Sequence, residues 1–453
     1  MNSSAQFDLI IRHAEVVTPD QVRKMDVGIK DETIAALESN LSGSANEEID
    51  ASGLHLFPGV IDSHVHFNDP GRSDWEGIET GSRAFAAGGG TLFFDMPLNA
   101  SPPTIDVDAF DRKLAEAVRK SVTDFAFWGG IVPGNLEQLK PLAKRGVIGF
   151  KAFMCDSGIE DFPRADDETL REAMQRAADL DRLVAVHAES HETTQRFTAD
   201  LVNQGRTSAR DFLASRPIAA ELAAIRRALD LAQETGCRLH VVHVSSGAGV
   251  ALITEAARAG VRVTCESCPH YLILTEEDMA RLGAVAKCAP PLRTRLEQDR
   301  LWDSLGRGEV ATIGSDHSPC TPAMKAAPNF FKVWGGISGV QHTLPLLLTE
   351  GVSRGTSLLE LARHVSINVV KTFNLPATKR GVAVGTDADL AIVDLTGTFP
   401  IDRDQLLDRH RQSPYVGRKL TAKVVQTILR GRTLFKNGRV VGQPAGKLVK
   451  PAA

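Results

Sequence analysis

Residues 55–67 read HLFPGVIDSHVHF, an apolar run that ends in His64-Val65-His66, two histidines one residue apart. Side chains two positions apart on a β-strand point to the same face. If this run is a strand, His64 and His66 present both imidazoles on one side of its carboxyl end. Two imidazoles placed in this way can share a metal ion. The alternative is a pair of hydrogen-bonded or exposed histidines.

Seven further apolar runs follow, each of a length typical of a buried strand: GTLFFDMP, DFAFWGGIV, VIGFKAFM, RLVAVHAE, RLHVVHVSS, VRVTCESC and VATIGSDHS. Helix-like segments lie between most of them, among them Asp108–Lys120, Asp167–Asp179 and Ala219–Thr235. Eight strand–helix units predict an α/β protein with a closed parallel (β/α)8 barrel of the TIM type. A doubly wound sheet would carry a glycine-rich turn after its first strand. The glycine run at 88–90 precedes a strand instead.

The two ends of the chain have a different pattern. Short strand-like runs with turns between them fill the first 56 residues and the segment after about residue 380, and Asn437-Gly438 is a strong hairpin signal. We expect a small β-sandwich domain built from both termini. The expected boundaries are 1–56 for its first part, 57–378 for the barrel and 379–453 for its second part.

The composition is that of an ordinary globular protein, with 43% hydrophobic and 24% charged residues among 453. A formal net charge of −4 gives no indication of a nucleic-acid partner or of binding to an acidic membrane surface. No apolar stretch approaches the roughly 20 residues that span a bilayer. The first residues read as a short strand rather than a signal peptide. We therefore expect a cytoplasmic protein.

The six cysteines are scattered along the chain, which is typical of reduced thiols rather than of a disulfide framework. Cys265 and Cys268 form a C-x-x-C pattern, but no second pair accompanies them. Residues three apart on a strand point to opposite faces. The pattern therefore gives little support to a structural zinc or redox site.

Ligand-type side chains also end several of the other predicted strands. His187 ends VAVHAE, His243 lies in LHVVHVSS, and Asp316 lies in ATIGSDHS. A lone histidine in such a run is more often a satisfied core residue. In a barrel, however, the carboxyl ends of all strands converge on one mouth, where active sites lie. Four histidines and an aspartate at equivalent strand ends therefore predict a metal centre.

Lys151 ends the apolar strand VIGFKAFM and would lie in the same mouth. A lysine cation buried beside metal ions is strongly disfavoured. One alternative is an ordinary lysine whose amine reaches solvent. The other is a neutral amine that has captured carbon dioxide as a carbamate, an anion able to bridge two metals. The readily shifted pKa of lysine makes this chemistry accessible.

This set of residues resembles the binuclear site of the amidohydrolase superfamily, and more narrowly that of its cyclic amidohydrolases, namely dihydroorotases, hydantoinases, dihydropyrimidinases and allantoinases. The resemblance spans nearly the whole chain. It implies one divalent ion held by His64, His66 and Asp316, a second held by His187 and His243, and a carboxylated Lys151 between them. It also implies that Asp316 moves the proton of a bridging hydroxide to the leaving nitrogen.

The same resemblance implies a homotetramer. It does not identify the metal: zinc is the leading candidate, while manganese, cobalt, nickel and iron also accept imidazole and carboxylate ligands.

Four stretches resemble allantoinases in particular: Asp95–Asn99, Lys287–Arg293, Ser315–Cys320 and Trp334–Ile337. Dihydroorotases carry an arginine two residues after H-x-H, but Asn68 stands there in this chain, and an amide cannot form the bidentate pair that arginine makes with a carboxylate. Hydantoinases and dihydropyrimidinases usually carry a tyrosine five residues after the bridging lysine, where this chain has Asp156. The resemblance therefore implies opening of the hydantoin ring of allantoin to allantoate.

Asn68, the backbone of Ala289 and Ser318 are the expected contacts for this small ureide substrate. His270, in the familiar stretch Cys268–Tyr271, is expected either to support the site or to contact substrate. Two alternatives stay open. Within enzymes, the substrate could be a hydantoin or dihydropyrimidine, with dihydroorotate further behind. From another class, the chain could be a metal-free scaffold, although such relatives have typically lost several ligands and all six are present here.

Overall fold

The computed structural model describes residues 6–452, and its centre is a ring of eight parallel strand positions. These are β6 (Val60–Val65), β7 (Gly90–Asp95), β8 (Asp124–Phe127) continued by β9 (Gly129–Gly130), β10 (Phe150–Phe153), β11 (Leu183–His187), β12 (Arg238–Val241), β13 (Val263–Ser267) and β14 (Thr312–Ile313). Hydrogen bonding runs through β6–β7–β8 and through β9–β10–β11–β12–β13–β14. Val65 pairs with His317 just beyond β14, which closes the ring. The (β/α)8 barrel is confirmed.

The stretch 55–67, expected as one strand, is divided between two sheets. β5 (His55–Pro58) pairs with strands of a second sheet, and only β6 belongs to the barrel. Gly59 lies between them, where a Cβ atom would come within 2.3 Å of Thr91 Oγ1. A side chain at this crossover would collide with β7, so the chain can pass from one sheet to the other only through glycine.

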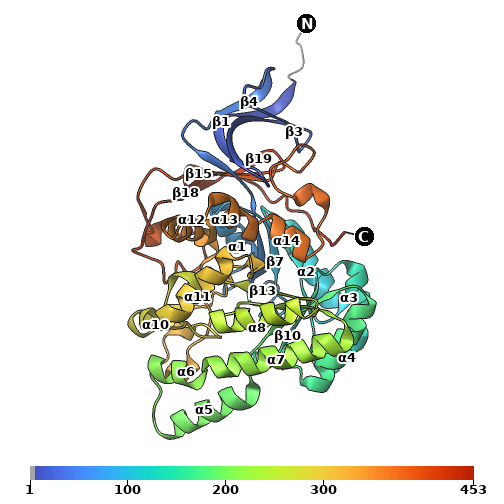
Figure 1. Ribbon diagram of the computed structural model, residues 1–453, viewed down its shortest axis with the longest axis vertical. Helices are drawn as coiled ribbons and strands as arrows, with labels where there is room; N and C mark the ends of the chain where they lie inside the picture. Colours follow the sequence, from blue (N-terminus) through green and yellow to red (C-terminus); the bar gives the residue numbers. More distant parts are fainter. Residues whose placement is uncertain (1–5, 453) are drawn as a thin grey trace.

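The second sheet draws strands from both ends of the chain, as the sequence predicted, and lies above the barrel in Figure 1. Its order is β20-β19-β18-β15-β5-β1-β2-β3, with β4 paired to β1. The bounds are β1 Phe7–Val17, β2 Val22–Lys30, β3 Thr33–Glu38, β4 Ala45–Asp50, β15 Leu390–Asp394, β18 Lys423–Leu429, β19 Arg432–Lys436 and β20 Arg439–Val440. A short pair, β16 (Phe399–Pro400) and β17 (Lys419–Leu420), lies apart from it. We propose one domain boundary close to the expected 56/57, at the crossover around Gly59 where β5 ends, and the other near 378/379.

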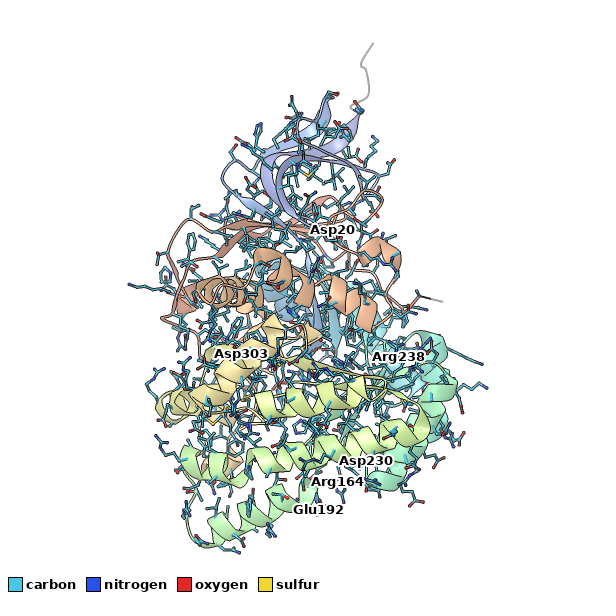
Figure 2. All side chains as sticks on the ribbon, in the orientation of Figure 1. Asp20, Arg164, Glu192, Asp230, Arg238 and Asp303 are labelled. Carbon is cyan, nitrogen blue, oxygen red and sulfur yellow. The ribbon has the colours of Figure 1, made fainter. Side chains whose placement is uncertain are left out.

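Helices cover the outside of the barrel (Figure 1). Their bounds are α1 Ile78–Ala87, α2 Val107–Lys120, α3 Leu139–Arg145, α4 Asp167–Asp179, α5 His191–Asn203, α6 Ala209–Ser215, α7 Ile218–Thr235, α8 Gly247–Arg258, α9 Pro269–Ile273, α10 Glu276–Leu282, α11 Arg295–Gly306, α12 Thr343–Ser353, α13 Leu358–His364 and α14 Ile367–Thr372. The three helices expected from the sequence are present. The outer faces of the helices around the barrel carry exposed charges, such as Glu192 on α5, Asp230 on α7 and Asp303 on α11 (Figure 2).

The barrel strands are buried on both faces, because helices pack outside and side chains fill the interior. This burial explains their nearly continuous apolar sequences. All six cysteines are buried and free, in agreement with reduced thiols. Among residues 6–452, no helix has the length and apolar character needed to cross a membrane.

Candidate metal centre

The six residues expected as metal ligands come from five strands. Their positions are His64 in β6, His66 just after it, Lys151 in β10, His187 at the end of β11, His243 two residues past β12 and Asp316 three residues past β14. Five of these positions lie at or just past the carboxyl ends of barrel strands, and Lys151 is the second residue of the short strand β10. His243 and Asp316 have positive φ angles of 40° and 45°, a backbone conformation that non-glycine residues adopt at an energetic cost. Both strained residues are expected ligands, so the backbone strain is located at the candidate metal centre.

Asp62 connects β6, the first barrel strand, with the segment just after β14, the last one, by hydrogen bonds. One of its carboxylate oxygens accepts hydrogen bonds from the backbone N–H groups of His64 and Ser315, each at 3.0 Å. Burial raises the pKa of Asp62 to about 6. These two bonds fix the strand ends that carry His64 and Asp316.

His64, His66 and Asp316 form the first cluster. Asp316 Oδ1 lies 3.3 Å from Nε2 of His64 and 3.3 Å from Nε2 of His66. The three side chains are almost completely buried, and each offers a ligand atom to one common point. Burial raises the pKa of Asp316, but the charge on His64 and the hydrogen bond to His66 outweigh it, so that the pKa falls to about 2.

His187 and His243 form the second cluster. His187 Nδ1 lies 3.1 Å from His243 Nε2, with the ring centroids 4.7 Å apart. The His243 ring is also 5.4 Å from that of His64, so the two clusters adjoin. Burial lowers the pKa of His66 and His187, and it lowers that of His243 well below the usual value. The buried rings therefore favour the neutral form, which is the form that binds metals.

Lys151 is buried between the same strand ends. Its side-chain nitrogen has no hydrogen-bond partner within the described part of the chain, and it lies 5.0 Å from the centre of the Phe153 ring. Burial lowers the pKa of this amine to about 7. The alternative of a lysine that reaches solvent is therefore wrong for this chain.

Two buried carboxylates that the sequence did not lead us to expect lie behind the histidines. Glu266 Oε1 is 2.9 Å from His64 Nδ1, and Glu189 Oε2 is 2.8 Å from His187 Nε2. Arg216 pairs with Glu189 at 2.5 Å. Such carboxylates fix the tautomer and orientation of metal-binding imidazoles. Glu189 could have been found, because it lies two residues after His187 in HAE and thus repeats the spacing of the first histidine pair.

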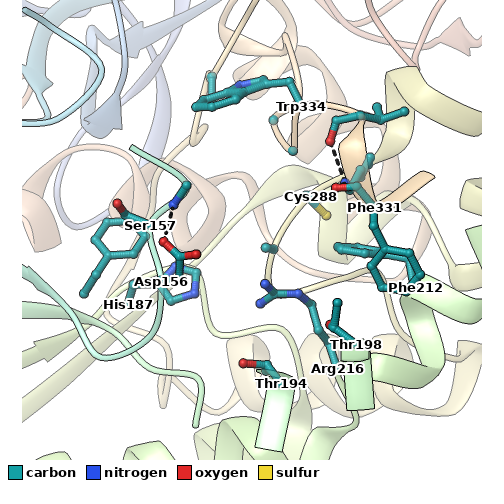
Figure 3. A pocket seen from close by; sticks show the side chains of 18 of the residues that line it. Asp156, Ser157, His187, Thr194, Thr198, Phe212, Arg216, Cys288, Phe331 and Trp334 are labelled. Atoms are coloured by element: carbon teal, nitrogen blue, oxygen red, sulfur yellow. Dashed lines mark hydrogen bonds between the residues drawn. The ribbon is translucent and has the colours of Figure 1, made fainter. Parts of the chain in front are cut away.

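A cavity of about 710 Å³ opens over both clusters. Figure 3 shows part of its lining, including His187 of the second cluster. Five of the expected ligands line it, as do Ala289 and Ser318, two of the three expected substrate contacts. Asn68, the third, is buried outside the lining, with its Nδ2 atom 3.5 Å from the carbonyl oxygen of Pro319. His270 is buried with both ring nitrogens unpartnered among the described residues, and burial lowers its pKa to about 4. The roles of these four residues stay predictions.

The chain matches the amidohydrolase family over residues 55–434. This span holds the whole barrel and every residue of both clusters.

The chain belongs to the amidohydrolase family.

Among curated amidohydrolase relatives, an allantoinase from Rubrobacter xylanophilus is 54% identical to this chain, with 98% of each chain covered. An allantoinase from Deinococcus radiodurans is 49% identical over 98% of this chain and 99% of its own. Among solved structures, the L-hydantoinase (dihydropyrimidinase) from Arthrobacter aurescens is 36% identical, with a TM-score of 0.95, and the match covers 98% of this chain and all of the other. These likenesses extend over both the barrel and the small sheet.

Proposed function

We propose that this amidohydrolase opens the hydantoin ring of allantoin to give allantoate. The observation that carries the proposal is the meeting of four buried imidazoles, an ionised aspartate and, beside them, a buried lysine without a hydrogen-bond partner among the described residues, next to one cavity. The choice of allantoin rests on likeness to relatives named allantoinase, at 54% and 49% identity over nearly the full chain. The more distant likeness to hydantoinases, at 36%, makes hydantoin the natural comparison substrate.

The described residues fit two divalent ions. When His64 donates its Nδ1 proton to Glu266, the lone pair of its Nε2 atom faces a carboxylate oxygen of Asp316 at 3.3 Å. This arrangement is repulsive unless a cation lies between the two atoms. His64, His66 and Asp316 would hold one ion, and His187 and His243 the other. When bound, the two ions supply Lewis acidity, which acidifies water and polarises a ring carbonyl.

Lys151 would bind both ions as a carbamate. Its amine is buried and has no hydrogen-bond partner among the described residues. It lies near enough to Asp316 for that carboxylate to raise the pKa of the amine, and near enough to His243 to lower the pKa of that imidazole. A neutral amine can add to carbon dioxide and lose a proton, which converts an unfavourable buried cation into an anion with two oxygen ligands.

Asp316 would transfer the proton. Its low pKa keeps the carboxylate ionised and ready to accept a proton from the attacking water. The water oxygen adds to the ring carbonyl carbon, the carbon–nitrogen bond breaks, and Asp316 returns the proton to the departing nitrogen. The product then carries a carboxylate and an open ureide. Glu266 and Glu189 hold the imidazoles of His64 and His187 in place during these steps.

The test is a side-by-side assay of the metal-loaded protein on allantoin, hydantoin, dihydrouracil and dihydroorotate. We expect kcat/KM to be highest for allantoin, and metal analysis to give two ions per chain. Faster hydrolysis of any other substrate contradicts the choice of allantoin. Fewer than one ion per chain in active protein contradicts the binuclear site. A cytoplasmic location, a homotetramer and zinc as the metal stay predictions.

A further inference from the structure

We infer that Asp156 is the residue that selects a substrate with a ureido arm. This inference rests on the proposed function, because allantoin is a hydantoin ring bearing a ureido group. The ureido group carries several N–H donors, and hydantoin itself lacks the arm. A residue that reads the arm must therefore offer a hydrogen-bond acceptor inside the cavity but away from the reacting ring.

Asp156 meets the first requirement, a free acceptor. Among the described residues that line the cavity, only Asp316 and Asp156 carry carboxylates, and Asp316 belongs to the expected ligand set. Asp156 Oδ1 accepts a hydrogen bond from the backbone N–H of Gly158 at 3.0 Å. The exposed side chain can offer its second oxygen to a bound molecule. A carboxylate accepts hydrogen bonds and cannot donate them, so it suits N–H groups and disfavours carbonyl oxygens.

Asp156 also stands on an anchored loop. It lies five residues after Lys151, in the loop between β10 and α4. Ser157 braces this loop by donating a hydrogen bond to the carbonyl oxygen of Phe162 at 2.6 Å, and Ile159 and Phe162 are buried beneath it. The carboxylate therefore projects from an anchored loop, which reduces the entropy lost when it binds a ligand.

The opposite wall offers the complementary group. Figure 3 shows Asp156 and Arg216 on different sides of the cavity. Arg216 lines the cavity and pairs with Glu189 through one nitrogen of its guanidinium. The ureido carbonyl oxygen can face the guanidinium while the N–H groups face Asp156. Lys287 is also in the lining, but its side-chain nitrogen already donates to three backbone carbonyls.

Asp156→Asn tests the assignment with almost no change in shape. The amide oxygen can keep the bond from Gly158, but its NH2 group then meets the N–H donors of the arm. Hydrogen bonds to charged groups contribute about 1.5–3 kcal/mol, which corresponds to a loss of about 10- to 100-fold in kcat/KM for allantoin. For hydantoin we expect kcat/KM to stay within about twofold of the unchanged protein. Metal content should not change.

The control is Glu160→Gln, which removes an exposed carboxylate from the same loop but outside the cavity lining. It should leave both substrates unaffected. Equal losses on allantoin and hydantoin in Asp156→Asn, or no loss on either, would overturn the inference. Absence of allantoin hydrolysis in the unchanged protein would instead contradict the proposed function, so the two failures can be told apart.

Discussion

Glu266 Oε1 lies 2.9 Å from His64 Nδ1, and both side chains are buried at the carboxyl ends of β13 and β6, two barrel strands that β14 separates. Ser63 also hydrogen-bonds to Glu266. Burial raises the pKa of this carboxyl, but hydrogen bonding and charge from His240 and His64 outweigh burial and hold the pKa far below its usual range. The carboxylate is therefore ionised and fixes the proton of His64 on Nδ1. The same arrangement recurs at the second cluster, where Glu189 faces His187.

Replacement of this carboxylate should weaken metal binding. In Glu266→Gln an amide takes the place of the anion, so the basicity of His64 falls and its tautomer is no longer fixed. We expect metal affinity to drop about 10- to 100-fold and activity to recover at high metal concentration. Metal titration with activity as the readout measures this. Glu255→Gln, an exposed change on α8, is the control. Activity that is lost but not recovered with added metal would contradict the role assigned to Glu266.

Removal of Lys151 should abolish activity unless a carboxylate is supplied from solution. Lys151→Ala removes the proposed carbamate and leaves a space beside Phe153. We expect a loss of about 1000-fold or more, since the bridge contributes several kcal/mol to the arrangement of the metals. Short-chain carboxylic acids such as acetate or propionate should restore part of the activity. Metal content and kcat, measured with and without the acid, give the answer. Unchanged hydrolysis and metal content without acid would refute the mechanism.

The stability of the metal-free, uncarboxylated protein should depend on pH because the amine of Lys151 is buried. Burial lowers the pKa of Lys151 from 10.5 to about 7. Between these values the unfolded chain binds a proton that the folded chain does not, so stability contributed by this group rises with pH. The rise is at most about 1.4 kcal/mol per pH unit. Urea unfolding, carried out after a chelator has removed the metal, measures the free energy of unfolding of Lys151→Met and of the unchanged chain. The difference between the two free energies should change steadily from pH 7 to 10.

The direction of that change follows from the same linkage. Lys151→Met has no titrating amine at this position. The amount by which its free energy of unfolding exceeds that of the unchanged chain should therefore be largest near pH 7 and should shrink towards pH 10. A gap that stays constant over this range would show that the amine is not buried in the apoprotein.

The backbone of one wall of the cavity should depend on Lys325 for its position. Its ammonium group donates to the carbonyl oxygens of Ala284, Trp334 and Gly336 at 3.0, 2.9 and 2.8 Å. Lys325→Met leaves these carbonyls without their donor, which costs about 1–3 kcal/mol in the free energy of unfolding. Because Trp334 and Gly336 line the cavity, we expect KM to rise more than kcat falls.

Thermal unfolding and steady-state kinetics of Lys325→Met measure both effects. Lys144→Met, an exposed change on α3, is the control, and Lys325→Arg should recover part of the loss because it keeps donors. A lower melting temperature with an unchanged KM would show that the wall holds its shape without the lysine.

Periodicity and residue type alone predicted most of the barrel strands, several helices and the candidate ligands of this protein. Continuous apolar runs such as VIGFKAFM and RLVAVHAE predicted buried parallel strands, because a strand covered on both faces needs no polar side. The helices at 108–120, 167–179 and 219–235 were predicted almost to the residue, since their apolar positions follow the helical repeat. The candidate ligands were found because each lies late in an apolar run. A histidine, aspartate or lysine at such a position is typical of an active site at the mouth of a barrel.

Only the tertiary structure decided which groups meet across the barrel. Glu266 reaches His64 over 202 positions of sequence, and Arg216 reaches Glu189 over 27, which no local pattern encodes. The same holds for Asn68, which stands beside the histidine pair in the sequence but is buried outside the cavity lining. The physical reason is that local pattern sets which face of an element is buried, whereas closure of the ring and the backbone turns at His243 and Asp316 set what each buried side chain touches.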